Sequence, residues 1–183
     1  MRRCRLWIGW LLSLACIFIP VASISAAPSP YGYALTLGGV SYLPDSIPDI
    51  GFFGFTLVAA PVSSTVLEPS FYLEAKFALR NGLYDIHDLN AGMKFTLFKT
   101  TNHPFEFLMP INPTVYAPAM HIALQHTLHK ATPLRVVAGV SLFRLLEKDA
   151  WYEWLSPFVI YNPYAGECEA WGITLLHFTY LKH

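Results

Sequence analysis

Three of the seven histidines lie close together in the sequence and are the first candidates for metal or proton chemistry: His121, His126 and His129. On a β-strand, His121 and His129 would lie ~26 Å apart, too far to share a metal ion, and His126 would face the opposite side. On a helix, His126 and His129 would touch, but two imidazoles without a nearby carboxylate make a poor metal site. We therefore expect polar interior or rim residues here, and we predict no metal site.

Other reactive side chains are also scattered. Cys168 lies between Glu167 and Glu169, whose negative charges disfavour the thiolate, so we expect a passive loop cysteine. No serine lies in the G-x-S-x-G pattern of a nucleophile elbow. A further group of charges is predicted to form a solvated loop: Glu147, Lys148, Asp149 and Glu153. The sequence thus predicts neither catalytic residues nor a cofactor, and we expect the protein not to be an enzyme.

The strongest pattern is a strict alternation of apolar and polar residues from Ser70 to Arg80, which returns from Leu89 to Phe98. Apolar residues at every second position indicate β-strands, whereas a helix places them every three or four positions. One face carries the residues predicted to contact lipid: Phe71, Leu73, Phe77, Leu79, Met93, Phe95 and Leu97. The other carries those predicted to face the lumen of a barrel: Glu74, Lys76, Arg80, Asn90 and Lys94.

The connection between these two strands, around Asn81-Gly82, is constrained by their phase. A two-residue turn at 81–82 would place Glu74 opposite Leu89, which puts a charge on the apolar face. A three-residue loop over 81–83 restores the phase, and a longer loop of the same parity would pair Glu74 with Lys94 instead. The pairs predicted for the three-residue loop are Glu74 with Asn90 and Lys76 with Asp88. Either way, the interior contains compensated charges.

Similar patterns along the chain predict an all-β protein. The candidate strands are 31–42, 51–60, 70–80, 89–98, 105–109, 117–130, 134–146, 155–161 and 170–181. Bacterial single-chain barrels have an even number of strands, and prolines interrupt the stretch from 103 to 118. We therefore predict an antiparallel up-and-down transmembrane β-barrel of eight strands, with ten as the alternative. The segment 117–130 also contains good helix formers, but we favour a strand.

The first residues predict an export signal. Arg2, Arg3 and Arg5 precede an apolar stretch from Leu6 to Ile19, and small residues follow. This stretch is shorter than the roughly 20 residues of a membrane-spanning helix, so we prefer a cleaved signal peptide over an uncleaved anchor. A lipoprotein signal ending at Cys16 is a weaker alternative. We predict a signal peptide helix over 1–26 and a β-barrel domain over 27–183.

Composition after cleavage limits the partners. Nine Lys and Arg residues then face twelve Asp and Glu residues, so no basic surface suggests nucleic acid. Cys168 remains as the only cysteine, which excludes an internal disulfide. Tyr and Trp residues gather near the predicted strand ends, as in the interfacial girdles of membrane barrels.

The signal peptide, the length after cleavage and alternating segments such as Phe71 to Phe77 resemble small eight-stranded outer-membrane barrels of the OmpA-transmembrane, OmpX and OmpW type. The resemblance covers the whole exported chain and is architectural. It implies a location in the outer membrane of a diderm bacterium, in contact with lipid. It also implies either a small porin-like or OmpW-like conduit for apolar or amphipathic solutes, or an envelope-structural barrel whose loops contact host or surface ligands. For the conduit, we expect an interior that mixes charges with Phe98, Phe143 and Tyr72.

Two other classes remain open. A secreted lipocalin-like barrel that binds an apolar ligand would invert the phase, with Phe71 to Leu79 inward and the charges in water. A membrane-embedded lipid-modifying enzyme would need a His, Ser and acid constellation that the sequence does not assemble.

Overall fold

The alternating segments form long antiparallel strands in the computed structural model, which describes residues 31–43, 49–59, 69–80, 83–102, 114–128, 134–147 and 150–182. The strands are β1 (Tyr31–Tyr42), β2 (Ile50–Ala59), β3 (Pro69–Arg80), β4 (Leu83–Thr96), β5 (Val115–Tyr116), β6 (Ala119–Thr127), β7 (Arg135–Ser141), β8 (Phe143–Leu146), β9 (Ala150–Asn162) and β10 (Glu167–Lys182). The predicted signal peptide and the candidate strand at 105–109 lie outside the described residues.

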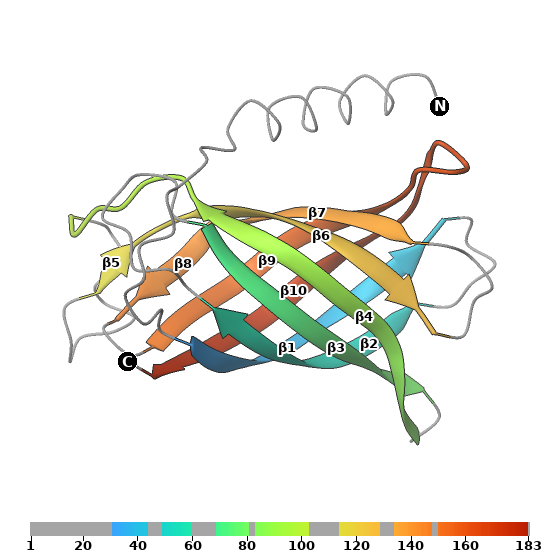
Figure 1. Cartoon of the computed structure of the whole chain (residues 1–183), viewed down its shortest axis with the longest axis horizontal. Coiled ribbons are helices and arrows are strands. Elements are labelled where there is room, and N and C mark those ends of the chain that lie inside the picture. The colour runs from blue at the N-terminus through green and yellow to red at the C-terminus, as the bar shows by residue number, and fades with distance from the viewer. Residues whose placement is uncertain are drawn as a thin grey trace.

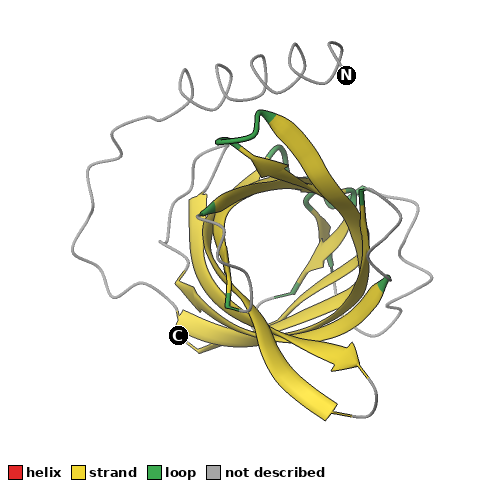
Figure 2. Cartoon of the chain, turned by 90° about the vertical axis from the view of Figure 1, so that its right-hand side faces the viewer, coloured by secondary structure: helices red, strands yellow, loops and turns green. Residues whose placement is uncertain are grey.

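These segments close into an eight-stranded antiparallel barrel, as predicted (Figures 1 and 2). β9 pairs with both β7 and β8, so these two are parts of one barrel strand interrupted at Leu142. β5 and β6 are similarly separated by Ala117 and Pro118, and proline cannot donate a backbone hydrogen bond. Pairing of β1 with β10 closes the barrel, and the first and last strand ends, Tyr31 and Lys182, lie opposite each other at one rim.

The connection between β3 and β4 corrects one prediction. Glu74 pairs with Asn90, as predicted, but Arg80 pairs with Leu83, so only residues 81 and 82 separate the two strands. The three-residue loop is therefore wrong. The register shifts farther along, beyond Phe77, where His87 is an extra residue in β4. This β-bulge restores the phase that the short connection would otherwise lose.

The segment that allowed either helix or strand is a strand, β6, as favoured. Ala123 and Gln125 are buried inside the barrel, whereas His126 on the other face is exposed. Residue 129 lies outside the described residues. Among the described residues, no helix has the length and apolar character needed to cross a membrane.

Several large inward side chains pack over a glycine that is their cross-strand partner on the neighbouring strand. A Cβ atom added to Gly139 would lie 2.5 Å from Cε1 of His121, its cross-strand partner. Alternating small and large residues in this way lets a narrow barrel fill its interior. The cross-strand pairs of this kind are Gly38 with Phe52, Gly92 with Tyr72, Gly139 with His121 and Gly172 with Phe158.

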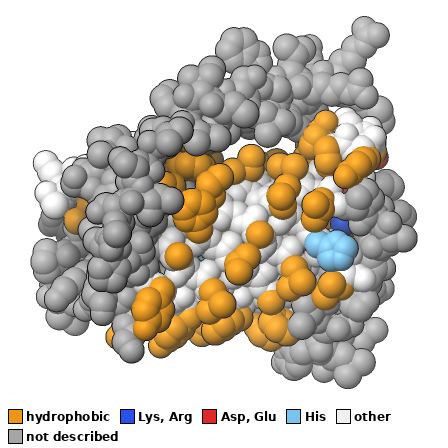
Figure 3. Space-filling view, in the orientation of Figure 1, with side chains coloured by type: hydrophobic (Ala, Val, Ile, Leu, Met, Phe, Trp, Pro, Cys, Tyr) orange, Lys and Arg blue, Asp and Glu red, His pale blue; other side chains and the backbone are white. Residues whose placement is uncertain are grey.

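The outer surface is apolar. Phe71 and Leu73 of β3 are 50% and 60% exposed, and exposed Leu, Phe and Tyr residues continue around the neighbouring strands. Figure 3 shows hydrophobic side chains spread over one such face. Small residues, including Ala91 and Gly92, form part of an apolar hollow of about 680 Å³ in the wall of β2, β3, β4, β6 and β7.

Candidate functional site

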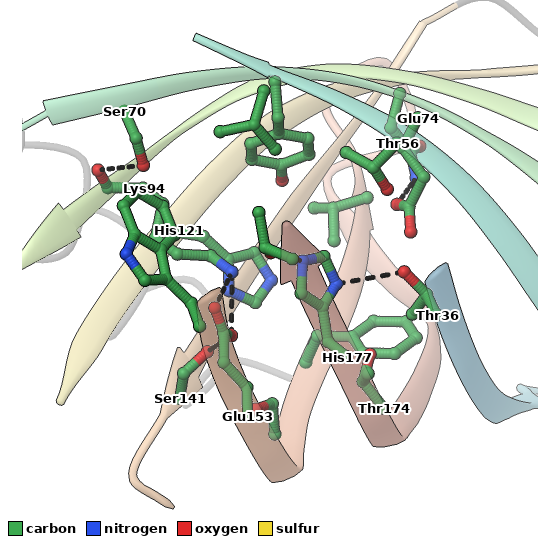
Figure 4. A pocket seen from close by; sticks show the side chains of 18 of the residues that line it. Thr36, Thr56, Ser70, Glu74, Lys94, His121, Ser141, Glu153, Thr174 and His177 are labelled. Atoms are coloured by element: carbon green, nitrogen blue, oxygen red, sulfur yellow. Dashed lines mark hydrogen bonds and ion pairs between the residues drawn. The ribbon is translucent and has the colours of Figure 1, made fainter. Parts of the chain in front are cut away.

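The inside of the barrel is the candidate functional site, because it gathers most of the buried charged and polar side chains. Residues from all eight barrel strands line a cavity of about 50 Å³, part of which is shown in Figure 4. The lining includes Glu74, Lys76, Lys94, Glu153 and His177. These positions alternate with outward apolar residues along each strand, which is why the sequence pattern brings them together.

The centre of the site is an ion pair between Lys94 of β4 and Glu153 of β9. Lys94 Nζ lies 2.7 Å from both carboxylate oxygens of Glu153, and Ser141 Oγ donates to Oε2 at 2.7 Å. Glu153 is only 1% exposed. A buried carboxylate requires such charged and hydrogen-bonded partners to offset its desolvation.

Arg144 of β8 extends this cluster toward the rim that carries the chain ends. Its Nε lies 3.3 Å from Glu153 Oε1, and its Nη1 donates to Thr96 Oγ1 at 2.8 Å and to the Ala117 carbonyl at 3.5 Å. The guanidinium also lies 4.6 Å from the ring centroid of Trp151. One arginine thus connects β4, the β5–β6 junction and β9.

A second charged group lies on β3 and β4. Asn90 Nδ2 donates to Glu74 Oε2 at 2.9 Å, and Lys76 Nζ lies 3.7 Å from the same oxygen. The Lys76 ammonium also lies between two aromatic rings, 4.4 Å from the centroid of Phe52 and 4.5 Å from that of Phe158. Cation–π attraction therefore supplements a long ion pair.

His177 of β10 faces the same cavity (Figure 4). Its Nδ1 lies 3.0 Å from Thr36 Oγ1 on β1, and its Nε2 lies 3.0 Å from Thr179 Oγ1. Both ring nitrogens therefore have a hydroxyl partner, and the ring links the first and last strands at the point where the barrel closes.

A separate polar cluster lies toward the rim where β6 meets β7 and β9 meets β10. Arg135 donates to Glu169 through Nε and to Thr127 Oγ1 through Nη1 at 2.7 Å. Thr127 Oγ1 in turn donates to Asp88 Oδ1 at 2.6 Å, and Asn162 Nδ2 donates to Glu169 Oε1 at 2.7 Å. The cluster connects five strands at this end: β4, β6, β7, β9 and β10.

Between the cavity and this rim cluster lies a set of buried, mainly hydrophobic residues, which we call the apolar layer. Along β9 the inward residues run from Ser156 at the cavity through Phe158 and Ile160 to Asn162 of the rim cluster. The interior is therefore divided along the barrel axis. The apolar layer consists of Val40, Tyr42, Ile50, Phe52, Ala78, Ala123, Val137, Phe158, Ile160 and Ala170.

The structure brings four of the predicted lumen residues together: Glu74, Lys76, Asn90 and Lys94 all line the cavity. The side chains of Arg80 and Leu79 lie outside what the structure describes. On the other face, Phe71 and Leu73 are exposed, whereas four further residues are half-buried in the outer wall: Phe77, Met93, Phe95 and Leu97.

Glu153 corrects a second prediction. It lies at the centre of the interior and not in a solvated loop, since β9 begins at Ala150. Glu147 follows β8, and residues 148 and 149 lie outside the described residues. The alternation of inward and outward residues is interrupted at Leu155, whose φ is 49°. Glu153 and Ser156 therefore both point inward although they are three residues apart.

Three further expectations are wrong. Phe98 and Phe143 are exposed and do not contribute to the interior, where only Tyr72 of the expected aromatic residues lies. Cys168 is not in a loop: it is half-buried near the start of β10, paired with Tyr161. The β9–β10 hairpin is longer than the sequence pattern indicated, and its connection therefore begins after Asn162.

Arg144 and His177 are among the interior residues that the sequence reasoning missed. Arg144 follows the break at Leu142, and His177 is three residues from Thr174 although both line the cavity. At each place the period of two is interrupted, so alternation alone gives no signal. Within the described parts of the chain, no group of three or more His, Cys, Asp and Glu side chains is arranged to hold a metal ion.

The fold and the interior define a small closed β-barrel with an apolar outer surface and a charged, hydrogen-bonded inside. Comparison with known proteins found no matching family model, no similar curated protein and no similar solved structure.

Proposed function

We propose that the chain is an integral barrel of the outer membrane of a diderm bacterium, with an envelope-structural or surface-interaction role. The observation that carries this proposal is the distribution of polarity between the two faces of the wall. Leu35, Leu57 and Leu73 are each more than half exposed, whereas Glu74, Lys76 and Glu153 are buried inside. Lipid is the solvent that favours such an outer surface, and a closed barrel leaves no unpaired strand edge within it.

Aromatic residues on the outside support the same proposal. Tyr33 of β1 packs against Tyr180 of β10, with ring centroids 5.5 Å apart, and Tyr152 packs against Trp154 and Phe178 at 6.0 and 5.2 Å. These residues lie toward the rim that carries the two chain ends. Tyr and Trp bands of this kind occur where a membrane barrel meets the headgroup region.

The filled interior favours the structural role over a conduit. A cavity of about 50 Å³ holds only a few water molecules, and the Lys94–Glu153 pair crosses the inside of the barrel. Passage of an apolar or amphipathic solute would require this network to separate. The lipocalin-like alternative has less support because a carrier of apolar ligands needs a large apolar interior, whereas this one contains carboxylates and lysines.

The experiment is fractionation of cells that produce the full chain, followed by electrophoresis with and without heating. We expect the protein in the outer-membrane fraction, resistant to carbonate extraction, and we expect the unheated barrel to migrate differently from the heated chain. A variant without residues 1–26 serves as the control and should remain in the cytoplasm. Recovery of the full chain as a soluble periplasmic protein would contradict the proposal.

Planar-bilayer recording separates the two roles within the membrane. The refolded barrel should give no sustained conductance if its interior stays closed. Steady conductance, or uptake of a small amphipathic dye into vesicles that contain the protein, would instead support the conduit.

A further inference from the structure

Four buried polar atoms of the cavity lining have no hydrogen-bond partner among the residues that the structure describes. They are Thr56 Oγ1, Asn90 Oδ1, His121 Nδ1 and Ser156 Oγ. Thr56, Asn90 and Ser156 are each less than 5% exposed. Buried polar atoms of this kind are costly unless a ligand or an ordered water molecule completes their hydrogen bonding. The four atoms come from β2, β4, β6 and β9, so they approach one space from different sides.

The size and charge of the cavity specify the ligand. The lining contains two glutamates, Glu74 and Glu153, and two lysines, Lys76 and Lys94, so their formal charges cancel. A neutral ligand is therefore favoured over an ion. Because one water molecule needs about 10–15 Å³ of such volume, a cavity of about 50 Å³ has room for about three to five of them.

We propose that this cavity binds a cluster of about three to five water molecules, closed on one side by the apolar layer. The waters bridge the Glu74–Asn90 group to the Lys94–Glu153 group and provide partners for the four unpaired atoms. Thr56, His121 and His177 face this common space in Figure 4. The cluster is thus part of the polar network and not bulk solvent in a pore.

The cavity is also asymmetric along the barrel. On one side its lining includes Val58, Ser70 and Trp151, each next to a strand end at the rim of the two chain termini. On the other side it ends at Lys76 and Phe158, where the apolar layer begins. Along the described strands, the cavity therefore lies toward the terminal rim, and the apolar layer separates it from the rim cluster at the other end. An apolar constriction that excludes water is a barrier to ions as well.

The test is water-to-methyl cross-relaxation by NMR on the full barrel domain refolded in deuterated detergent micelles. We expect cross-peaks from water to the methyl groups of Val58, which lines the cavity, and none to Ile160 or Ala170 of the apolar layer. The absence of a water cross-peak at Val58 would show a dry cavity and overturn the proposal. Water cross-peaks at Ile160 or Ala170 in the unmodified protein would contradict the proposal that the apolar layer excludes water.

Two variants sharpen the result. Ser156→Val replaces a hydroxyl by methyl groups inside the cavity, so the Val58 cross-peak should weaken by at least half. Phe158→Ala should extend the water cross-peaks to Ile160, and an unchanged pattern in this folded variant would contradict the role of the ring. Because the measurements are made in micelles, they do not depend on where the cell places the barrel, and they can fail independently of fractionation.

Discussion

Lys94 Nζ contacts both carboxylate oxygens of Glu153 at 2.7 Å, across the inside of the barrel from β4 to β9. These strands are not neighbours in the sheet, since β6 and β7 lie between them. The ion pair therefore fixes the distance between opposite parts of the wall, which backbone pairing alone does not do. Its two charges are buried, so each depends on the other for compensation.

Glu153→Gln should destabilise the barrel by about 3–5 kcal/mol, because Lys94 and Arg144 then lack their shared carboxylate. Urea unfolding of the refolded protein, followed by tryptophan fluorescence, measures this loss. Glu167→Gln is the matched control, since Glu167 is exposed at the start of β10 and its replacement should change stability by less than about 0.5 kcal/mol. Equal stabilities of the two variants would contradict the prediction.

Lys94→Met combined with Glu153→Gln should cost less than the sum of the two single changes. The double variant removes both members of the pair, so Lys94 is no longer left as an uncompensated charge, and only Arg144 still lacks its carboxylate partner. We expect a coupling energy of about 1–3 kcal/mol in a double-mutant cycle. The same cycle with Glu167→Gln in place of Glu153→Gln should be additive, and coupling of similar size there would show that the effect is not specific to the pair.

Arg144→Lys should also destabilise the barrel, although it conserves the charge. A lysine retains attraction to Glu153 but loses the planar fork that reaches Thr96 and stacks on Trp151. We expect a loss of about 1–3 kcal/mol and a change in tryptophan emission. Urea unfolding and tryptophan emission of the variant and of the unmodified protein measure these effects, and an unchanged stability would contradict the role of the planar fork.

Alternation in the sequence was sufficient for the wall of the barrel and for part of its interior. The period of two in β3 and β4 correctly paired Glu74 with Asn90 and Lys76 with Asp88. The route to this register was not predictable, because a two-residue connection with a bulge at His87 gives the same pairing as a three-residue loop. The polarity pattern shows how many unpaired residues the connection and the bulge contain together. It does not show how many of them belong to the connection and how many to the bulge.

Irregular positions account for the interior residues that were missed. Glu153 precedes the bulge at Leu155, and His177 follows a similar interruption between Thr174 and Leu176. A bulge shifts the phase by one residue, so an inward side chain beyond it appears on the wrong face of a simple alternation. For Glu153, the charged residues at 147 to 149 also favoured the incorrect prediction of a solvated loop. Three-dimensional pairing is needed to place such residues.

Two adjacent glycines of β1 provide a test of the packing inside the wall. A Cβ at Gly38 would lie 2.5 Å from both Phe52 Cζ and the Ile173 carbonyl oxygen. A Cβ at Gly39 would lie 3.8 Å from its nearest neighbour, the Ile50 carbonyl oxygen. Gly38→Ala should therefore destabilise the barrel by about 1–3 kcal/mol, whereas Gly39→Ala should be tolerated. Thermal unfolding of the two variants in parallel measures the difference, and similar losses would argue against the close approach of Phe52.

The environment of the outer wall is tested by Leu35→Arg. Leu35 lies near the middle of β1, is 57% exposed, and is paired with Phe55 and Phe178 on the two neighbouring strands. If lipid surrounds this position, the arginine should cost about 2–4 kcal/mol, because a charge near the bilayer midplane loses its hydration.

The matched control is Tyr164→Arg, since Tyr164 lies in the β9–β10 connection and is 72% exposed. This change should cost less than about 1 kcal/mol, the range found for charges near or beyond the interface. Both variants are unfolded by urea from phospholipid vesicles and, in parallel, from detergent micelles. A surface arginine on a soluble barrel is nearly neutral, so equal and small effects at both positions in vesicles would contradict a membrane location. A large loss of unfolding free energy in vesicles for Leu35→Arg, and not for Tyr164→Arg, would place the apolar face of β1 in lipid.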